Sequence, residues 1–194
     1  MSSFSMYLEL GWSHITDLNG FDHIVYLIAL LAVYGFGQLK RSLWLITAFT
    51  TGHSLTLVLA AAKIIAIPSD IIEFLIPVTI AITAIINLWN PGKKVDSKKM
   101  KINYFICLTF GFIHGLGFSN YFLALLGKEQ SIISPLLAFN LGIELGQVLI
   151  GLCIFTAAFL ARRFFNCKNR DWVLVVSGGA LALALSLMIE TKFW

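Results

Sequence analysis

The sequence predicts an all-α fold, a polytopic membrane bundle of six transmembrane helices. Of the 194 residues, 58% are hydrophobic and 12% are charged. The mean hydropathy of +0.85 describes a chain that water would not keep dispersed. Each of six stretches holds the about 20 mostly apolar residues that a helix needs to cross a bilayer core. We therefore expect a multi-pass integral membrane protein, with the lipid bilayer as a partner.

The six predicted spans follow one another in a single domain over residues 1–194. The first begins at Gly20, the third begins with Asp70 in its first turn, where acidic residues are favoured, and the last ends before Lys192. A longer basic loop at 90–101 separates three spans from three, so any structural repeat would be inverted across the membrane. The predicted spans cover residues 20–38, 43–62, 70–89, 103–126, 134–160 and 172–189.

Basic residues fall mostly in the first, third and fifth loops. Cytoplasmic loops retain Lys and Arg, so this pattern predicts that both termini face outward. The net charge of +4 then indicates contact with anionic lipid heads rather than a nucleic-acid partner. Residues 1–12 lack the basic start and apolar core of a cleavable signal peptide. The basic residues concerned are Lys40, Arg41, Lys93, Lys94, Lys98, Lys99, Lys101, Arg162, Arg163, Lys168 and Arg170, which leaves Lys63, Lys128 and Lys192 on the other side.

All four histidines lie in or at the edge of apolar segments. Counting inward at about 1.5 Å per residue places Asp22 and His23 at the outer mouth, and His53, His114 and Glu144 near the midplane. A charged group at that depth costs about 2.5–3.5 kcal/mol unless it is compensated, and a bound cation would compensate it. The sequence therefore predicts a membrane metal site. The alternative for His53 or His114 taken singly is a hydrogen bond between helices.

Further polar residues surround these candidates. His14, Asp70 and Glu73 could extend the outer mouth. For Asp70 and Glu73, the simpler interpretation is that they are solvated residues at the start of a helix, where acidic groups are favoured. Helical spacing predicts polar stripes that face the bundle interior, and it predicts that glycines four apart, such as Gly111 and Gly115, allow close helix contact. The supporting residues, for which hydrogen bonding between helices is an alternative to metal ligation, are Asn19, Thr50, Thr56, Asn140 and Gln147.

The donor types restrict the metal. Imidazole and carboxylate suit Ni²⁺, Co²⁺, Zn²⁺ or Cu²⁺ better than Mg²⁺ or Ca²⁺, which prefer oxygen shells. The three cysteines are widely spaced, so neither a disulfide framework nor a thiolate zinc site is expected. The chain also lacks a phosphate-binding Gly-x-x-x-x-Gly-Lys-Ser/Thr loop, which argues against direct use of ATP.

Four motifs in order resemble the HupE/UreJ family of membrane proteins, which is linked to nickel delivery. The motifs are Gly-Phe-Asp-His at 20–23, Phe-Thr-Thr-Gly-His-Ser-Leu-Thr at 49–56, Phe-Gly-Phe-Ile-His-Gly-Leu-Gly-Phe at 110–118 and Phe-Asn-Leu-Gly-Ile-Glu-Leu-Gly-Gln at 139–147. The resemblance implies a bacterial inner-membrane permease for nickel or cobalt, with Asp22, His23, His53, His114 and Glu144 on its polar motifs. It does not extend to His14, which lies farther from the Asp-His pair than the histidine of the family does.

Two other functions compete with a permease. An integral membrane zinc hydrolase would use histidines and an acid to activate water. A structural or assembly protein with polar helix contacts would bind no metal. We favour a transporter over an enzyme, because the polar residues extend from the outer mouth to the midplane and the sequence lacks a His-Glu-x-x-His motif. The sequence predicts no particular oligomeric state.

Overall fold

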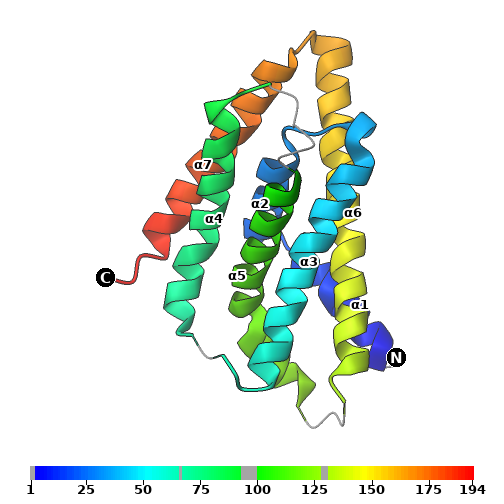
Figure 1. Ribbon diagram of the computed structural model, residues 1–194, viewed down its shortest axis with the longest axis vertical. Coiled ribbons are helices and arrows are strands. Elements are labelled where there is room, and N and C mark those ends of the chain that lie inside the picture. The colour runs from blue at the N-terminus through cyan, green and yellow to red at the C-terminus, as the bar shows by residue number, and fades with distance from the viewer. Residues whose placement is uncertain (1–2, 66, 93–99, 128–130) are drawn as a thin grey trace.

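The computed structural model describes residues 3–65, 67–92, 100–127 and 131–194, which form seven α-helices and one short 3₁₀ helix. No strand occurs among these residues, so the predicted all-α class is confirmed. The elements, shown in Figure 1, are α1 (Ser3–Thr16), α2 (Asp22–Leu31), η1 (Phe36–Gln38), α3 (Leu39–Ala61), α4 (Ser69–Trp89), α5 (Met100–Leu126), α6 (Ile133–Phe165) and α7 (Asn169–Glu190).

Five of the described helices are long and apolar enough to cross a membrane, namely α3 together with η1, and α4 to α7. They correspond to the last five predicted spans. On α6, Leu141, Leu145 and Leu149 stand four residues apart and are all exposed, so they form one apolar stripe on the outside of the bundle. Such an outward apolar face is suited to lipid contact, and the chain is a multi-pass membrane protein.

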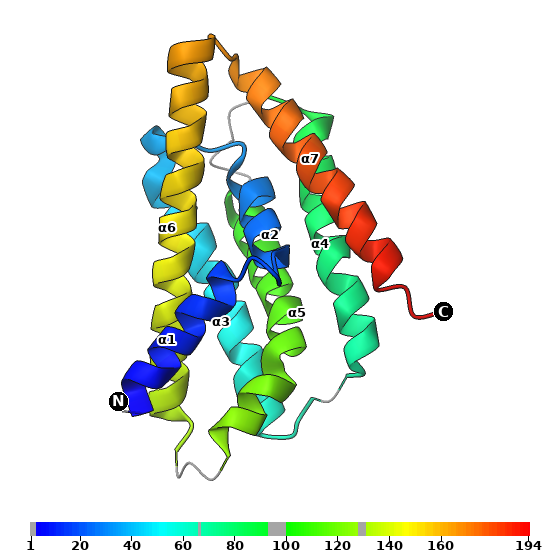
Figure 2. The ribbon, with the colours of Figure 1, turned by 180° about the vertical axis from the view of Figure 1, so that it is seen from behind.

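The first predicted span, at 20–38, has a different form in the structure. Its helix α2 has 10 residues, which extend over about 15 Å, or half of a bilayer core about 30 Å thick. The preceding residues form a further helix, α1, which the sequence analysis did not predict. Figures 1 and 2 show that α1 and α2 follow one another along the long axis of the molecule. Together they are compatible with a sixth, interrupted crossing.

Helix α2 lies in the centre of the bundle. It packs against α4, α6 and α7, and buried side chains such as Tyr26, Leu27 and Leu31 cover its circumference. A helix that is apolar on every side has to be surrounded by protein or by lipid. Here the surrounding helices fix the start of α2, which carries Asp22 and His23.

Glycines bring two pairs of helices into close contact. A Cβ added to Gly52 or Gly111 would collide with backbone atoms of Leu108 or Phe49, so α3 and α5 pack almost backbone to backbone. Helices α1 and α6 are joined in the same way, because a Cβ on Gly142 would collide with the backbone of Leu8. Small residues four apart permit such close packing in membranes. The side chains next to these glycines are therefore held at short range.

The basic residues of α3, α5, α6 and α7 gather at one end of the bundle. In Figure 1, η1, the start of α5, the end of α6 and the start of α7 all lie at the upper end. Arg162 at the end of α6 donates a hydrogen bond to Asn169 at the start of α7. This grouping agrees with the loop pattern of the sequence, although Lys93, Lys94, Lys98, Lys99 and Lys128 lie outside the described residues. The outward orientation of the termini remains a prediction, as does the inverted repeat.

Candidate metal centre

The candidate site forms where the chain breaks between α1 and α2. Residues 17–21 connect the two helices, and the backbone N–H of Asn19 donates to Asp17 Oδ1 at 2.9 Å. Asp, Asn and Gly favour such turns because their side chains bond locally or, for Gly, because no Cβ restricts the backbone. The break leaves His14 in the last turn of α1 and His23 in the first turn of α2.

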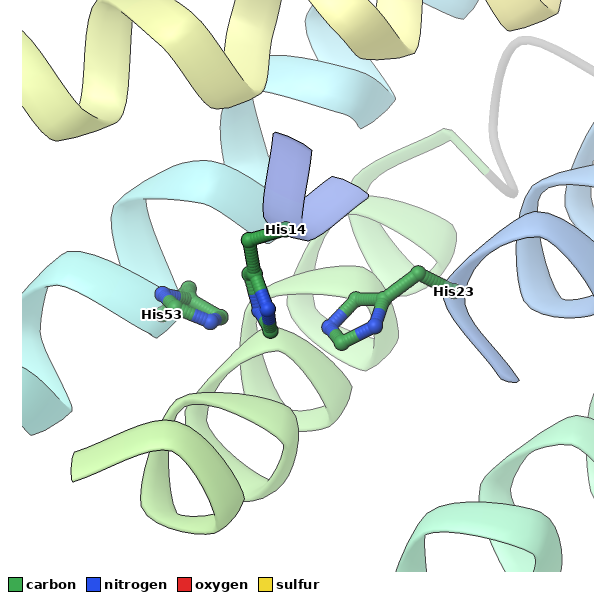
Figure 3. Close-up of side chains that lie close together, drawn as sticks. All are labelled: His14, His23 and His53. Carbon is green, nitrogen blue, oxygen red and sulfur yellow. The ribbon is translucent and has the colours of Figure 1, made fainter. Parts of the chain in front are cut away.

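Three imidazoles from three helices meet at this break. One ligand nitrogen each from His14, His23 and His53 can be chosen so that all lie within 4.8 Å of one another. The ring centroid of His14 lies 4.6 Å from that of His23 and 5.7 Å from that of His53. Figure 3 shows His14 between the other two rings. Ligand atoms around one transition-metal ion stand roughly 3 Å apart, given metal–nitrogen bonds of about 2 Å. Small side-chain rotations would therefore bring these nitrogens onto one ion.

A second group adds a fourth imidazole and a carboxylate. Asp22, His23 and His114 also offer ligand atoms within 4.8 Å of one another, and the ring centroids of His23 and His114 are 5.0 Å apart. His23 belongs to both groups. The histidines expected at the mouth and at the midplane thus form one continuous cluster, because the break in the first span lets α2 begin inside the bundle.

Many ring nitrogens of this cluster lack a partner. His23, His53 and His114 are buried, with His53 fully inaccessible. Among the described residues, the buried nitrogens without a hydrogen bond include His14 Nε2, His23 Nε2, both nitrogens of His53 and His114 Nδ1. A buried polar atom left bare costs about 1–3 kcal/mol. Their convergence favours a ligand that would accept several lone pairs at once.

Hydrogen bonds set which nitrogen of two histidines carries the lone pair. Asp22 Oδ1 accepts from His23 Nδ1 at 3.0 Å, which leaves His23 Nε2 free to bind a metal. The Thr79 hydroxyl donates to the Ile76 carbonyl at 2.7 Å, so its oxygen accepts from His114 Nε2 at 3.0 Å. His114 Nδ1 then keeps its lone pair. Partners of this kind orient metal-binding imidazoles and raise their basicity.

Aromatic rings and a glycine complete the walls. The ring centroid of Phe118 lies 3.9 Å from that of His14, and the Phe118 and Phe139 rings are nearly parallel at 5.0 Å. On the other side, a Cβ on Gly115 would come within 2.6 Å of the His53 carbonyl oxygen. The cluster is therefore enclosed by apolar groups on one side and by closely packed backbone on the other.

Acidic residues line the approach to the histidines. A cavity of about 240 Å³ is bordered by His14, His23 and His114 together with Asp17, Asp22 and Glu73. An adjoining cavity of about 210 Å³ shares Asp22 and Glu73 and also reaches Asn19. Negative charge along such a cleft raises the local concentration of cations. Asp70 borders neither cavity, and its carboxylate accepts from the Ile71 backbone N–H at 2.9 Å.

Glu144 and the remaining supporting residues lie along other contacts. The Thr47 hydroxyl donates to Glu144 Oε1 at 2.6 Å, and the Thr50 hydroxyl bonds Gln147 Oε1 at 2.8 Å, so these pairs form a polar seam between α3 and α6. Glu144 belongs to neither group of clustered ligands. The Thr56 hydroxyl lies 2.8 Å from the Phe112 carbonyl, which ties α3 to α5. Asn140 has a buried Oδ1 that finds no hydrogen-bond partner within the described part of the chain.

His14, Asp17 and Thr79 were not assigned these positions from the sequence. His14 was a mouth candidate to which the family resemblance did not extend, yet its ring lies in the middle of the cluster. The run from Asp17 to Gly20 was the available signal, because turn residues there end one helix and can fold His14 back toward His23. Thr79 was missed, and its sequence signal was a hydroxyl residue in the middle of an apolar span, which the structure buries.

The fold and these side chains define a polytopic membrane protein with an imidazole-rich candidate site inside its bundle. The family model described as HupE / UreJ protein matches residues 1–191, and the chain belongs to this family. Neither the search of curated proteins nor that of solved structures returned a match. Membership of the family suggests a nickel or cobalt accessory or permease role.

Proposed function

We propose that this protein is a secondary permease for a divalent transition metal, with Ni²⁺ or Co²⁺ as its substrate. The observation that carries the proposal is the convergence of unpaired, buried ring nitrogens of His14, His23, His53 and His114 at the break between α1 and α2. Interrupted helices with binding groups at their ends are a recurrent device of secondary transporters. Polar side chains in such a place are functional more often than structural.

The donor set supports a transition metal rather than Mg²⁺ or Ca²⁺. Neutral imidazoles with one nearby carboxylate suit Ni²⁺, Co²⁺, Cu²⁺ and Zn²⁺. None of the three cysteines joins the clustered ligands, so a thiolate site is not favoured. Affinity alone would rank Cu²⁺ above Ni²⁺ and Co²⁺. The preference for nickel or cobalt therefore comes from the family, and the supply of metal would enforce it.

The path we infer has three stages. The acidic cleft at Asp17, Asp22 and Glu73 would attract a hydrated cation. The imidazoles would then replace part of its water. The seam of Thr50 with Gln147 and Thr47 with Glu144 lies between α3 and α6, and Thr50 is one turn from His53 on α3. We propose this seam as the exit route, with Glu144 as its carboxylate.

Uptake of radioactive nickel and cobalt into proteoliposomes tests the proposal. We expect uptake by the wild type and its loss in His53→Ala and His114→Ala, because each substitution removes a convergent nitrogen. Thr109→Ala is the matched control on α5, since Thr109 is exposed and bonds only the Phe105 carbonyl of its own helix. Uptake that both histidine variants retain would refute the proposal. Tightly bound zinc without uptake, together with hydrolysis of a lipid or peptide, would instead assign an enzyme.

A further inference from the structure

A separate cavity lies at the opposite, basic end of the bundle. It measures about 650 Å³ and is formed by the first turns of α3 and α5. Lys40, Arg41 and Lys101 border it, together with the aromatic rings of Trp44 and Tyr104. None of these residues belongs to the histidine cluster or to the acidic cleft. Its chemistry therefore has to be explained apart from metal transport.

The electrostatics of this cavity favour an anion. No acidic side chain is found among the described residues that line it, whereas three cationic side chains are. At the start of α3 the Leu39 N–H already donates to the Phe36 carbonyl, so the attraction for an anion rests on the cationic side chains. Lysine and arginine are common protein partners of phosphate oxygens.

The surroundings of the cavity are those of a membrane interface. Trp44 is 55% exposed at its edge, and Ile102 and Phe105 are 61% and 68% exposed on the neighbouring face of α5. Tryptophan and tyrosine concentrate at the level of lipid headgroups, and lysine and arginine extend toward them. An occupant with a charged head in the cavity and an apolar tail against these side chains would match both parts of the surface.

We propose that this cavity binds the phosphate-bearing headgroup of an anionic phospholipid. Lys40 and Lys101 hold the phosphate, while the acyl chains lie along Trp44 and Phe105. A soluble phosphate compound would use the same cations, but it would leave the flanking apolar side chains uncovered. Basic pockets between transmembrane helices are a known form of lipid-headgroup site.

Native mass spectrometry of the protein released from nanodiscs tests this site. Discs of phosphatidylcholine with and without phosphatidylglycerol are compared for wild type, Lys40→Gln/Lys101→Gln, and the control Arg163→Gln/Lys168→Gln. The control removes the same charge at the same end of the bundle, from residues that do not line the cavity. All three are first checked for helix content and monodispersity.

We expect the wild type to retain one phosphatidylglycerol and the cavity variant to bind it about 30-fold more weakly, since each lysine contributes about 1 kcal/mol to binding an anionic lipid. The control variant should match the wild type. Equal retention by all three proteins would overturn the proposal. So would displacement of the lipid by millimolar inorganic phosphate, because that result would assign the cavity to a soluble anion. Nickel uptake is a separate readout, so either proposal can fail alone.

Discussion

His14 and His23 face each other across the break between α1 and α2, with ring centroids 4.6 Å apart and planes at 70°. On one continuous helix, residues nine apart would be separated by roughly 13 Å along the axis. The break at residues 17–21 is therefore what brings the two rings together. It also opens the cleft that Asp17 and Asp22 line, so a single interruption supplies both the binding groups and their access.

Replacement of His14 tests whether the first helix contributes to the site. We expect His14→Ala to lower nickel binding and uptake at least about tenfold, because it removes a ring that contacts both His23 and His53. Isothermal titration and proteoliposome uptake measure the two effects. Ser13→Ala, at an exposed neighbouring position, is the control. Wild-type binding by His14→Ala would exclude α1 from the site.

Replacement of Thr79 tests whether its hydroxyl orients the His114 ring. Thr79→Val keeps the volume but removes the acceptor of His114 Nε2, so the orientation and tautomer of the ring are no longer fixed. We expect nickel affinity to fall about 10- to 100-fold, as for other partners of metal-binding imidazoles. Thr83→Val is a matched control one turn along α4, since Thr83 bonds only the Thr79 carbonyl. Equal affinities of the two variants would contradict this role.

Close packing of α3 on α5 is expected to support the position of His53. Gly111→Ala puts a methyl group against the Phe49 backbone, and we expect it to destabilise the protein by about 1–3 kcal/mol or more. Thermal unfolding in detergent, followed by circular dichroism, measures the change. Gly178→Ala serves as the control, because nothing lies within 4 Å of an added Cβ there, and it should unfold at the same temperature or higher. The reverse order would contradict the packing account.

Replacement of Glu144 distinguishes metal binding at the histidine cluster from metal passage along the inferred exit route. We expect Glu144→Gln to bind nickel with nearly wild-type affinity, because its carboxylate bonds Thr47 and lies in neither ligand group. Uptake should nevertheless fall, since the seam loses its charge. Leu145→Ala, at the exposed adjacent position, controls for disturbance of α6. Loss of binding in Glu144→Gln would instead return Glu144 to the ligand set that its sequence motif suggests.

The sequence predicted the helical class and the last five spans, because long apolar runs dominate those regions. It also singled out His23, His53 and His114, since imidazoles are rare in hydrocarbon. The position of α1 could not be predicted in this way, because its contact with α6 depends on Gly142 meeting the backbone of Leu8. Nor could spacing reveal that Glu144 faces Thr47, since the hydropathy pattern locates a span but not the rotation of one helix against another.

Nickel X-ray absorption spectroscopy on the purified protein in nanodiscs tests the central claim most directly. We predict one nickel ion per chain, with several imidazole nitrogens in its first coordination shell. The imidazole signal should decrease in both His14→Ala and His53→Ala, because the two rings come from different helices and meet only at the break. A shell of water or carboxylate oxygens alone, or a spectrum that neither substitution changes, would contradict the account.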